Sequence, residues 1–235
     1  MITVRPIYYT HHLTQWQALA SALGLNKLSG PDEAGAEFGG DGHLALRGVE
    51  PGSAREAAVE LGFFTDELTE CESRLTAAGY AVESTHKEGA GPTLSLVDSP
   101  VATTITQKMT RDSAGRLSMC PIFYTDDFAP LNSVFTALGL QPRIASNRAV
   151  WTDFAAPGGG LVALHQPEGT SRRLELAMEY QAQLEELAER LRQAGFAPAI
   201  VDEAYNRTLR IPTPDGWTMS VNGVMEDMYG FHRLN

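Results

Sequence analysis

The 235-residue chain has few cysteines, few basic residues and no long apolar run. Its two cysteines, Cys71 and Cys120, form no CxxC pair, and we expect buried thiols in a reducing cytoplasm. The 18 Lys and Arg residues against 29 Asp and Glu give a net charge of −11, which disfavours nucleic acid and anionic lipid as partners. No segment approaches the roughly 20 apolar residues that cross a bilayer, and the N-terminus lacks a signal-peptide pattern. We therefore expect a cytoplasmic protein with neither nucleic-acid nor membrane partners.

The chain instead has enough apolar sequence to build a core, and it repeats itself. Hydrophobic residues make up 43%, which is typical of a globular protein. Residues 6–25 match residues 121–140 at an offset of 115, with 8 of 20 positions identical. Residues 67–81 match 183–197 at an offset of 116, with 7 of 15 identical. Two matches at nearly one offset predict a tandem duplication, with a polar linker at 108–117.

A weaker repeat inside each copy divides the chain into four modules. Each module has the pattern of a strand, a polar turn, a helix that stops at a glycine, and three further strands. The predicted first strands are 3–10, 57–64, 117–124 and 173–180, and the predicted helices are 13–23, 66–78, 127–138 and 182–194. The sequence therefore predicts a β-α-β-β-β module used four times.

Short motifs connect this module to a known family. Leu23-Gly24-Leu25 and Leu138-Gly139-Leu140 follow two of the helices, and Thr213-Pro214-Asp215-Gly216-Trp217 precedes the last strand. In these features the whole chain resembles the vicinal oxygen chelate superfamily, which includes glyoxalase I, bleomycin-resistance proteins and extradiol dioxygenases. The resemblance implies an α+β fold of four βαβββ modules paired into two half-open β-barrel domains, residues 1–110 and 116–235, each with its own cavity.

Enzymes of this superfamily usually hold a divalent metal through His, Glu or Gln on the first and last strands of their modules. Counting from the polar turns and from the prolines before the last strands places these positions at Val4, Val59 and Thr106, and at Met119, Glu175 and Ser220. A divalent cation needs about three nitrogen or oxygen donors from the protein. Only Glu175 is a ligand type, so we expect no metal cofactor.

The first functional hypothesis is accordingly a metal-free protein that binds a small organic ligand in a domain cavity, as a monomer or a homodimer. The alternative is a metal-dependent lyase, isomerase or dioxygenase of the same superfamily, and a third is a structural or regulatory module without a ligand. Glu175 is the candidate catalytic base, because a buried carboxylate holds its proton more tightly. The candidate ligand-binding residues are His165, Trp151, Phe123, Ser220, Trp217, Arg47, Tyr8 and Phe63.

Each of these residues also has a structural interpretation. The aromatic residues are equally suited to core packing, His165 to a solvated strand end and Glu175 to an ion pair. His11 and His12 align with Asp126 and Asp127, so we expect them at a helix N-terminus or on the surface rather than on a metal. The Gly158-Gly159-Gly160 segment precedes a strand and is predicted to form a hairpin turn, not a phosphate-binding loop.

Overall fold

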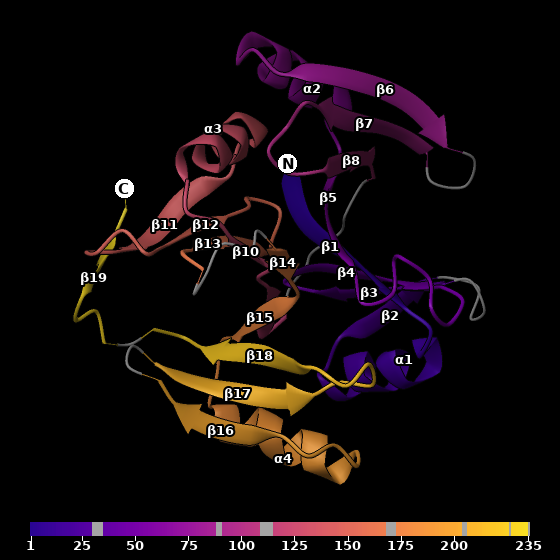
Figure 1. Ribbon diagram of the computed structural model, residues 1–235, viewed down its shortest axis with the longest axis vertical. Coiled ribbons are helices and arrows are strands. Elements are labelled where there is room, and N and C mark those ends of the chain that lie inside the picture. The colour runs from indigo at the N-terminus through magenta and orange to yellow at the C-terminus, as the bar shows by residue number, and fades with distance from the viewer. Residues whose placement is uncertain are drawn as a thin grey trace.

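A computed structural model of the chain describes residues 1–29, 35–87, 91–108, 115–167, 173–203, 206–225 and 227–234. These residues form a mixed α+β structure in which no sheet closes into a barrel (Figure 1). The helices of this part of the chain are α1 (Leu13–Ala22), α2 (Leu68–Ala77), α3 (Ala129–Leu138) and α4 (Leu184–Gln193). The predicted fold class is therefore confirmed, and each predicted helix matches an observed one within two residues at either end.

One eight-stranded sheet contains all the strands described between residues 2 and 107. Its central pair, β1 and β5, is antiparallel and joins two modules side by side. The strand order across the sheet is β2 (Asn26–Ser29), β3 (Gly35–Gly40), β4 (Gly42–Gly48), β1 (Ile2–Thr10), β5 (Val59–Thr65), β8 (Thr103–Gln107), β7 (Gly91–Val97) and β6 (Ala81–Lys87). Residues 1–110 are called the first half below, and residues 116–235 the second half.

The second half distributes its strands over two sheets. One sheet has the order β14 (Arg173–Glu175), β10 (Ile122–Tyr124), β13 (Leu161–His165), β12 (Trp151–Ala155), β11 (Gln141–Ser146) and β19 (Phe231–Arg233). The other has the order β16 (Ala199–Asp202), β17 (Arg207–Pro212), β18 (Thr218–Gly223), β15 (Ala177–Tyr180) and β9 (Leu117–Met119). The predicted strands 117–124 and 173–180 are thus each split in two. The pairs Met119–Met178 and Ile122–Glu175 keep one register across the split, so the strands bend without slipping.

The two halves exchange backbone hydrogen bonds through their glycine-rich hairpins. The β3–β4 hairpin reaches β9, where the N–H of Asp41 donates to Leu117 O at 2.9 Å and the N–H of Met119 donates to Asp41 O at 2.8 Å. The β12–β13 hairpin reaches β1 in the same way: the N–H of Gly158 donates to Ile2 O at 2.7 Å. The predicted turn at 158–160 is confirmed, and its glycines allow this close backbone approach.

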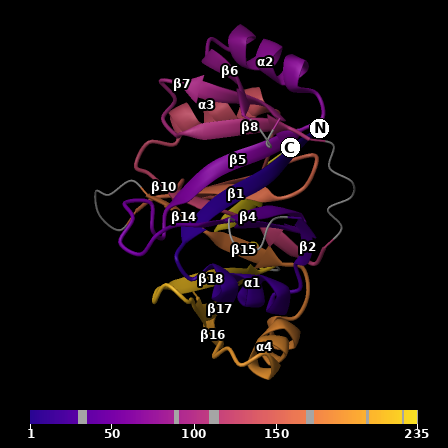
Figure 2. The same cartoon turned by 90° about the vertical axis from the view of Figure 1, so that its right-hand side faces the viewer.

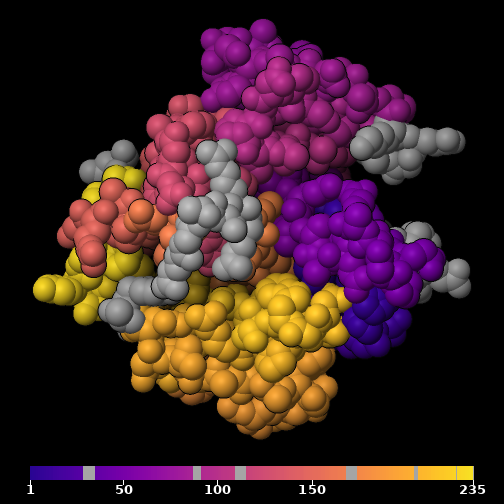
Figure 3. Space-filling view, in the orientation of Figure 1, coloured from indigo at the N-terminus to yellow at the C-terminus, as the bar shows by residue number. Residues whose placement is uncertain are grey.

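The helices meet in pairs at the two ends of the molecule, α2 beside α3 and α1 beside α4 (Figures 1 and 2). The space-filling view shows the first half packed closely against the part of the second half that contains α3 (Figure 3). Arg74 on α2 donates to Leu138 O at 3.2 Å, and Arg190 on α4 donates to Ala22 O at 2.8 Å. Each arginine therefore satisfies a carbonyl that the other half leaves open at a helix C-terminus.

A continuous apolar core lies between the helices and the sheets. Trp16 and Leu19 of α1 and Leu187 and Leu191 of α4 are fully buried in it, as the helical spacing of these residues requires. No helix in the described part of the chain is long and apolar enough to cross a membrane.

Candidate functional site

Asp215 lies at the junction between the two halves, inside a ring of first-half side chains. Tyr8 Oη donates to its carboxylate at 2.6 Å, Thr10 Oγ1 at 2.8 Å and Trp16 Nε1 at 2.5 Å. Trp217 Nε1 in turn donates to Tyr8 Oη at 2.8 Å. Burial, followed by the hydrogen bond to Asp215, raises the pKa of Tyr8 far above its ordinary value, so the phenol stays protonated and remains a donor. Three donors fix the carboxylate and leave it acceptor capacity for one further partner.

Two histidines lie against this carboxylate. The ligand atoms of His11, His12 and Asp215 all lie within 4.8 Å of one another, and all three residues are partly exposed. The His11 and His12 rings are 3.7 Å apart between centroids. His11 Nδ1 lies 2.5 Å from a Glu56 carboxylate oxygen, a close contact that is not aligned as a hydrogen bond. The sequence-based expectation of a helix N-terminus is correct in position, since His12 directly precedes α1, but the side chain of His12 makes no cap hydrogen bond.

These residues fit a divalent cation. Two imidazoles and one carboxylate form the set that holds iron(II) in many non-haem enzymes, and nitrogen and oxygen donors also suit manganese and zinc. The Glu56 carboxylate beside His11 adds a negative charge next to the cluster, which favours a bound cation. Partial exposure of all three side chains leaves room for water or substrate. The junction is therefore a candidate metal centre.

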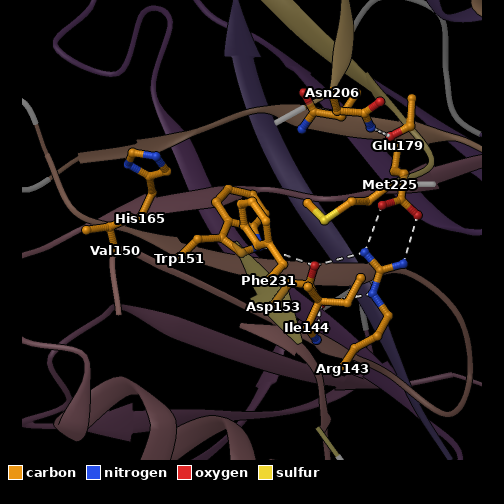
Figure 4. Close-up of a pocket in the computed structure, with 12 residues that line it drawn as sticks. Arg143, Ile144, Val150, Trp151, Asp153, His165, Glu179, Asn206, Met225 and Phe231 are labelled. Carbon is orange, nitrogen blue, oxygen red and sulfur yellow. Dashed lines mark hydrogen bonds and ion pairs between the residues drawn. The ribbon is translucent and has the colours of Figure 1, made fainter. Parts of the chain in front are cut away.

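A separate pocket of about 560 Å³, its open mouth included, lies in the second half (Figure 4). Arg143 of β11 crosses its floor and pairs with both Asp153 and Glu179. Its Nε and Nη2 donate to Asp153 at 2.9 and 2.8 Å, and its Nη1 and Nη2 donate to Glu179 at 2.9 and 2.7 Å. Burial alone would lower the pKa of Arg143, but these two carboxylates raise it well above its ordinary value. The three groups together carry one negative charge.

Aromatic and apolar side chains form the rest of this pocket. Trp151 and His165 meet edge to face with their ring centroids 5.7 Å apart, and Met225 and Phe231 also line the pocket (Figure 4). Cys120 lies near the floor, where burial and then the charges of Glu179 and Asp153 raise the pKa of its thiol. The thiol is therefore protonated and unsuited to metal binding.

This pocket does not fit the metal that the fold implies. Glu179 and Asn222 oppose each other on the first and last strands of their module and both line the pocket. The Glu179 carboxylate is already occupied by Arg143 and by Gln181 Nε2 at 2.7 Å, and Asp153 is occupied by Arg143 and by the N–H of Ile144 at 3.2 Å. The guanidinium takes the place that a cation would need.

The structure places seven of the nine predicted site residues in four places. His165 and Trp151 line the pocket, whereas Tyr8 and Trp217 belong to the junction. Arg47 is half-buried on the first-half sheet. Phe63 and Phe123 lie in the core, being 1% and 8% exposed.

Ser220 and Glu175 lie outside the described pocket lining. Ser220 accepts from Arg210 Nη1 at 2.8 Å, and Glu175 is half-buried on β14 opposite Ile122. Ile7, the equivalent of Ile122 at an offset of 115, pairs with Glu60, so Glu175 corresponds to Glu60 and not to Val59. The offset of 116 holds for the helices only, because the second half has one more residue between β15 and α4 than the first has between β5 and α2.

Sequence reasoning missed the residues with the densest interactions: Arg143, Asp153 and Glu179. One signal for them was present, because Asp153 is a charged residue in an apolar strand and shares a strand face with Trp151. For Asp215, the sequence offered only its place in a Pro-Asp-Gly turn. Its histidine partners come from a segment more than 200 positions away.

No protein-family model matches the sequence, and no curated protein matches it. Solved structures do. A catechol 2,3-dioxygenase is 15% identical with a TM-score of 0.64, over 95% of this chain and 87% of that one. The 2,3-dioxygenase LapB from Pseudomonas sp. KL28 is 12% identical with a TM-score of 0.64, over 99% and 92%. A Mn(II)-bound glyoxalase from Novosphingobium aromaticivorans is 15% identical with a TM-score of 0.62, over 96% and 84%. The chain therefore has the vicinal oxygen chelate fold, as predicted.

These findings overturn two expectations from the sequence. The metal-free binding protein is the wrong hypothesis, because structures that share the fold over nearly the whole chain are dioxygenases and a Mn(II)-bound glyoxalase. The expectation of no metal cofactor is also wrong, because His11, His12 and Asp215 form a candidate metal centre. Both errors have one cause: the count of donors was restricted to first and last strands, and this cluster lies just beyond the end of β1 and in the β17–β18 turn.

Proposed function

We propose that the protein is a divalent-metal-dependent enzyme of the lyase, isomerase or dioxygenase class, with the metal held by His11, His12 and Asp215. The observation that carries this proposal is the grouping of three donor atoms within 4.8 Å at the junction of the halves. The solved structures of the same fold support the reaction classes. A small-molecule substrate in a cytoplasmic setting is part of the proposal, and the two free, buried cysteines are compatible with a reducing compartment.

The surrounding residues have defined roles in this proposal. The Glu56 carboxylate lies beside His11 and would add negative charge next to the cation. Tyr8, Thr10 and Trp16 hold the Asp215 carboxylate in one orientation. When bound, the cation would polarise a substrate oxygen or a water molecule at the positions that the three side chains leave open. The fully buried Tyr8 and Trp16 keep water away from the inner side of the centre.

Metal analysis of the purified chain tests the proposal. After loading with Mn(II) and gel filtration, elemental analysis should find about one metal ion per chain in the wild type and in His86→Ala, a control on exposed β6. The double variant H11A/H12A should retain less than a tenth of the metal that the wild type retains. Equal retention by H11A/H12A and the wild type, or no retention by the wild type, would contradict the assignment.

Oxygen consumption separates the reaction classes. Uptake with catechol by the metal-loaded wild type, lost in H11A/H12A and kept in His86→Ala, would assign dioxygenase chemistry. Bound metal without oxygen uptake would leave the lyase or isomerase class.

A further inference from the structure

The first-half sheet carries a group of basic side chains on the face opposite α1. Ile7, Tyr9 and Ala45 form a small buried cluster on this face, in the register that pairs Ile7 with Ala45. Because side chains alternate along a strand, Arg5 and Arg47 lie on the same face. We call the set Arg5, Glu37, His43, Arg47, Phe64 and Lys108 the basic face.

Two cations of the basic face lie over one aromatic ring. The Arg5 guanidinium carbon and Lys108 Nζ are each 4.6 Å from the centroid of Phe64. Arg5 is 8% exposed, and its Nε and Nη2 donate to the Glu37 carboxylate at 2.9 and 2.8 Å. This bidentate pair occupies both oxygens of the carboxylate, which is the only one among the described residues that pairs with the basic face.

His43 leaves a polar atom without a hydrogen bond in the same place. It is 5% exposed, and its ring meets Phe64 edge to face with the centroids 5.2 Å apart. Its Nδ1 lies 3.7 Å from Glu37 Oε1, too far for a hydrogen bond, and has no other partner in the described structure. Burial lowers the pKa of His43, so the ring is neutral near pH 7. An unsatisfied buried nitrogen costs free energy that a bound ligand or water would recover.

Arg47 is a cation of the basic face whose charge has few polar partners. It is half-buried, and its one hydrogen bond in the described part of the chain goes from Nη1 to Leu46 O at 2.9 Å. No described carboxylate lies within ion-pair distance of it. Burial, followed by the charge of Arg5, lowers its pKa, which reflects the cost of holding this cation in place. Partial exposure leaves the guanidinium accessible to a solute.

The charges of the basic face do not cancel. Arg5, Arg47 and Lys108 contribute three positive charges and Glu37 one negative charge, which leaves +2 on a chain whose net charge is −11. We propose that the basic face binds a small anion that carries a carboxylate or phosphate group, with Arg47 as its main contact. This site is separate from the proposed metal centre and does not need a metal.

Thermal shift and calorimetry with the full chain, stripped of metal by EDTA and dialysed into Tris chloride at fixed ionic strength, test the site. Benzoate or inorganic phosphate should raise the melting temperature with concentration, whereas the neutral benzamide should not. Arg47→Leu should weaken the binding of the anion by roughly ten- to hundredfold, because a charge-assisted hydrogen bond is lost. Arg192→Leu, which removes an exposed arginine of α4, should leave it unchanged.

Without ligand, Arg47→Leu should melt at or above the wild-type temperature, because it removes an uncompensated cation. That result separates loss of binding from loss of folding. The proposal is overturned if benzoate and phosphate bind the wild type and Arg47→Leu equally, or if neither raises the melting temperature of the wild type. Since the metal has been removed, either outcome is independent of the metal assignment.

Discussion

Replacing Arg143 by Met should strongly destabilise the second half. Asp153 and Glu179 are 1% and 6% exposed, and in the wild type Arg143 compensates both charges. The variant leaves two buried carboxylates without their cation. Breaking a buried ion pair in this way costs about 3–5 kcal/mol. For a chain of this size, each kcal/mol corresponds to roughly 2–4 °C, so the melting temperature should fall by roughly 6–20 °C.

The pH dependence gives this prediction a sign. In Arg143→Met the folded state holds protons on the two carboxylates more tightly than the unfolded chain does, so the stability of the variant falls as the pH rises. The difference in the free energy of unfolding between the variant and the wild type should therefore be largest near pH 7 and shrink toward pH 4. Arg143 itself stays charged throughout this range, because its pKa is raised in the folded protein.

Urea unfolding followed by far-UV circular dichroism at pH 7 and pH 4 measures both effects. The triple variant R143M/D153N/E179Q is the matched control, since it removes the cation together with both charges. The triple variant should recover most of the stability that the single variant loses, and its stability should depend little on pH. A loss below about 1 kcal/mol in the single variant, or no recovery in the triple variant, would refute the reasoning.

Other predictions follow from single contacts. Gly160→Ala should lower the free energy of unfolding in urea by about 1–3 kcal/mol more than Gly52→Ala does. Both glycines have positive φ, +85° and +79°, but only at Gly160 would the new Cβ lie 2.7 Å from Val4 Cβ. Equal losses of stability in the two variants would contradict this. Between pH 7 and pH 5 the wild type should lose stability relative to His43→Leu. The pKa of buried His43 is lowered, so the unfolded chain takes up the proton first as the pH falls. Parallel curves of stability against pH for the two proteins would contradict this. Tyr8→Phe should cost about 1–3 kcal/mol and reduce Mn(II) retention, because it removes the 2.6 Å hydrogen bond that orients Asp215; unchanged retention would show that this bond does not support the centre.

The elements of the fold could be predicted because their signals are local. The helical spacing of apolar residues, the glycine after each helix and the alternation along the strands all lie within a few positions of one another. The repeating pattern of one strand, one helix and three strands does not include β19, which is three residues long. Strand β19 also exists only through its pairing with β11, more than 80 positions earlier, so its own sequence contains no signal for it.

The sites could not be predicted from the sequence in the same way. The metal cluster joins His11 to Asp215, and the pocket joins Arg143 to Glu179 across 36 positions. Such pairs depend on how the halves pack and on the strand register. Counting back from the polar turn places the candidate position at Glu175, four residues before Glu179, which is the residue that pairs with Asn222 on the last strand.

The exchanged hairpins determine what would happen to a half produced alone. Residues 1–110 contain both a projecting β3–β4 hairpin and a β1 strand whose Val4 N–H and Ile2 O are paired, in the whole chain, by the hairpin of the other half. The same fragment contains Arg74 and the open carbonyls of α1 that Arg190 satisfies in the intact chain. A fragment with both a donor surface and its acceptor is self-complementary, and such surfaces close into symmetric dimers. The isolated first half should therefore pair with its own copy, with a two-fold axis where the intact molecule has its junction.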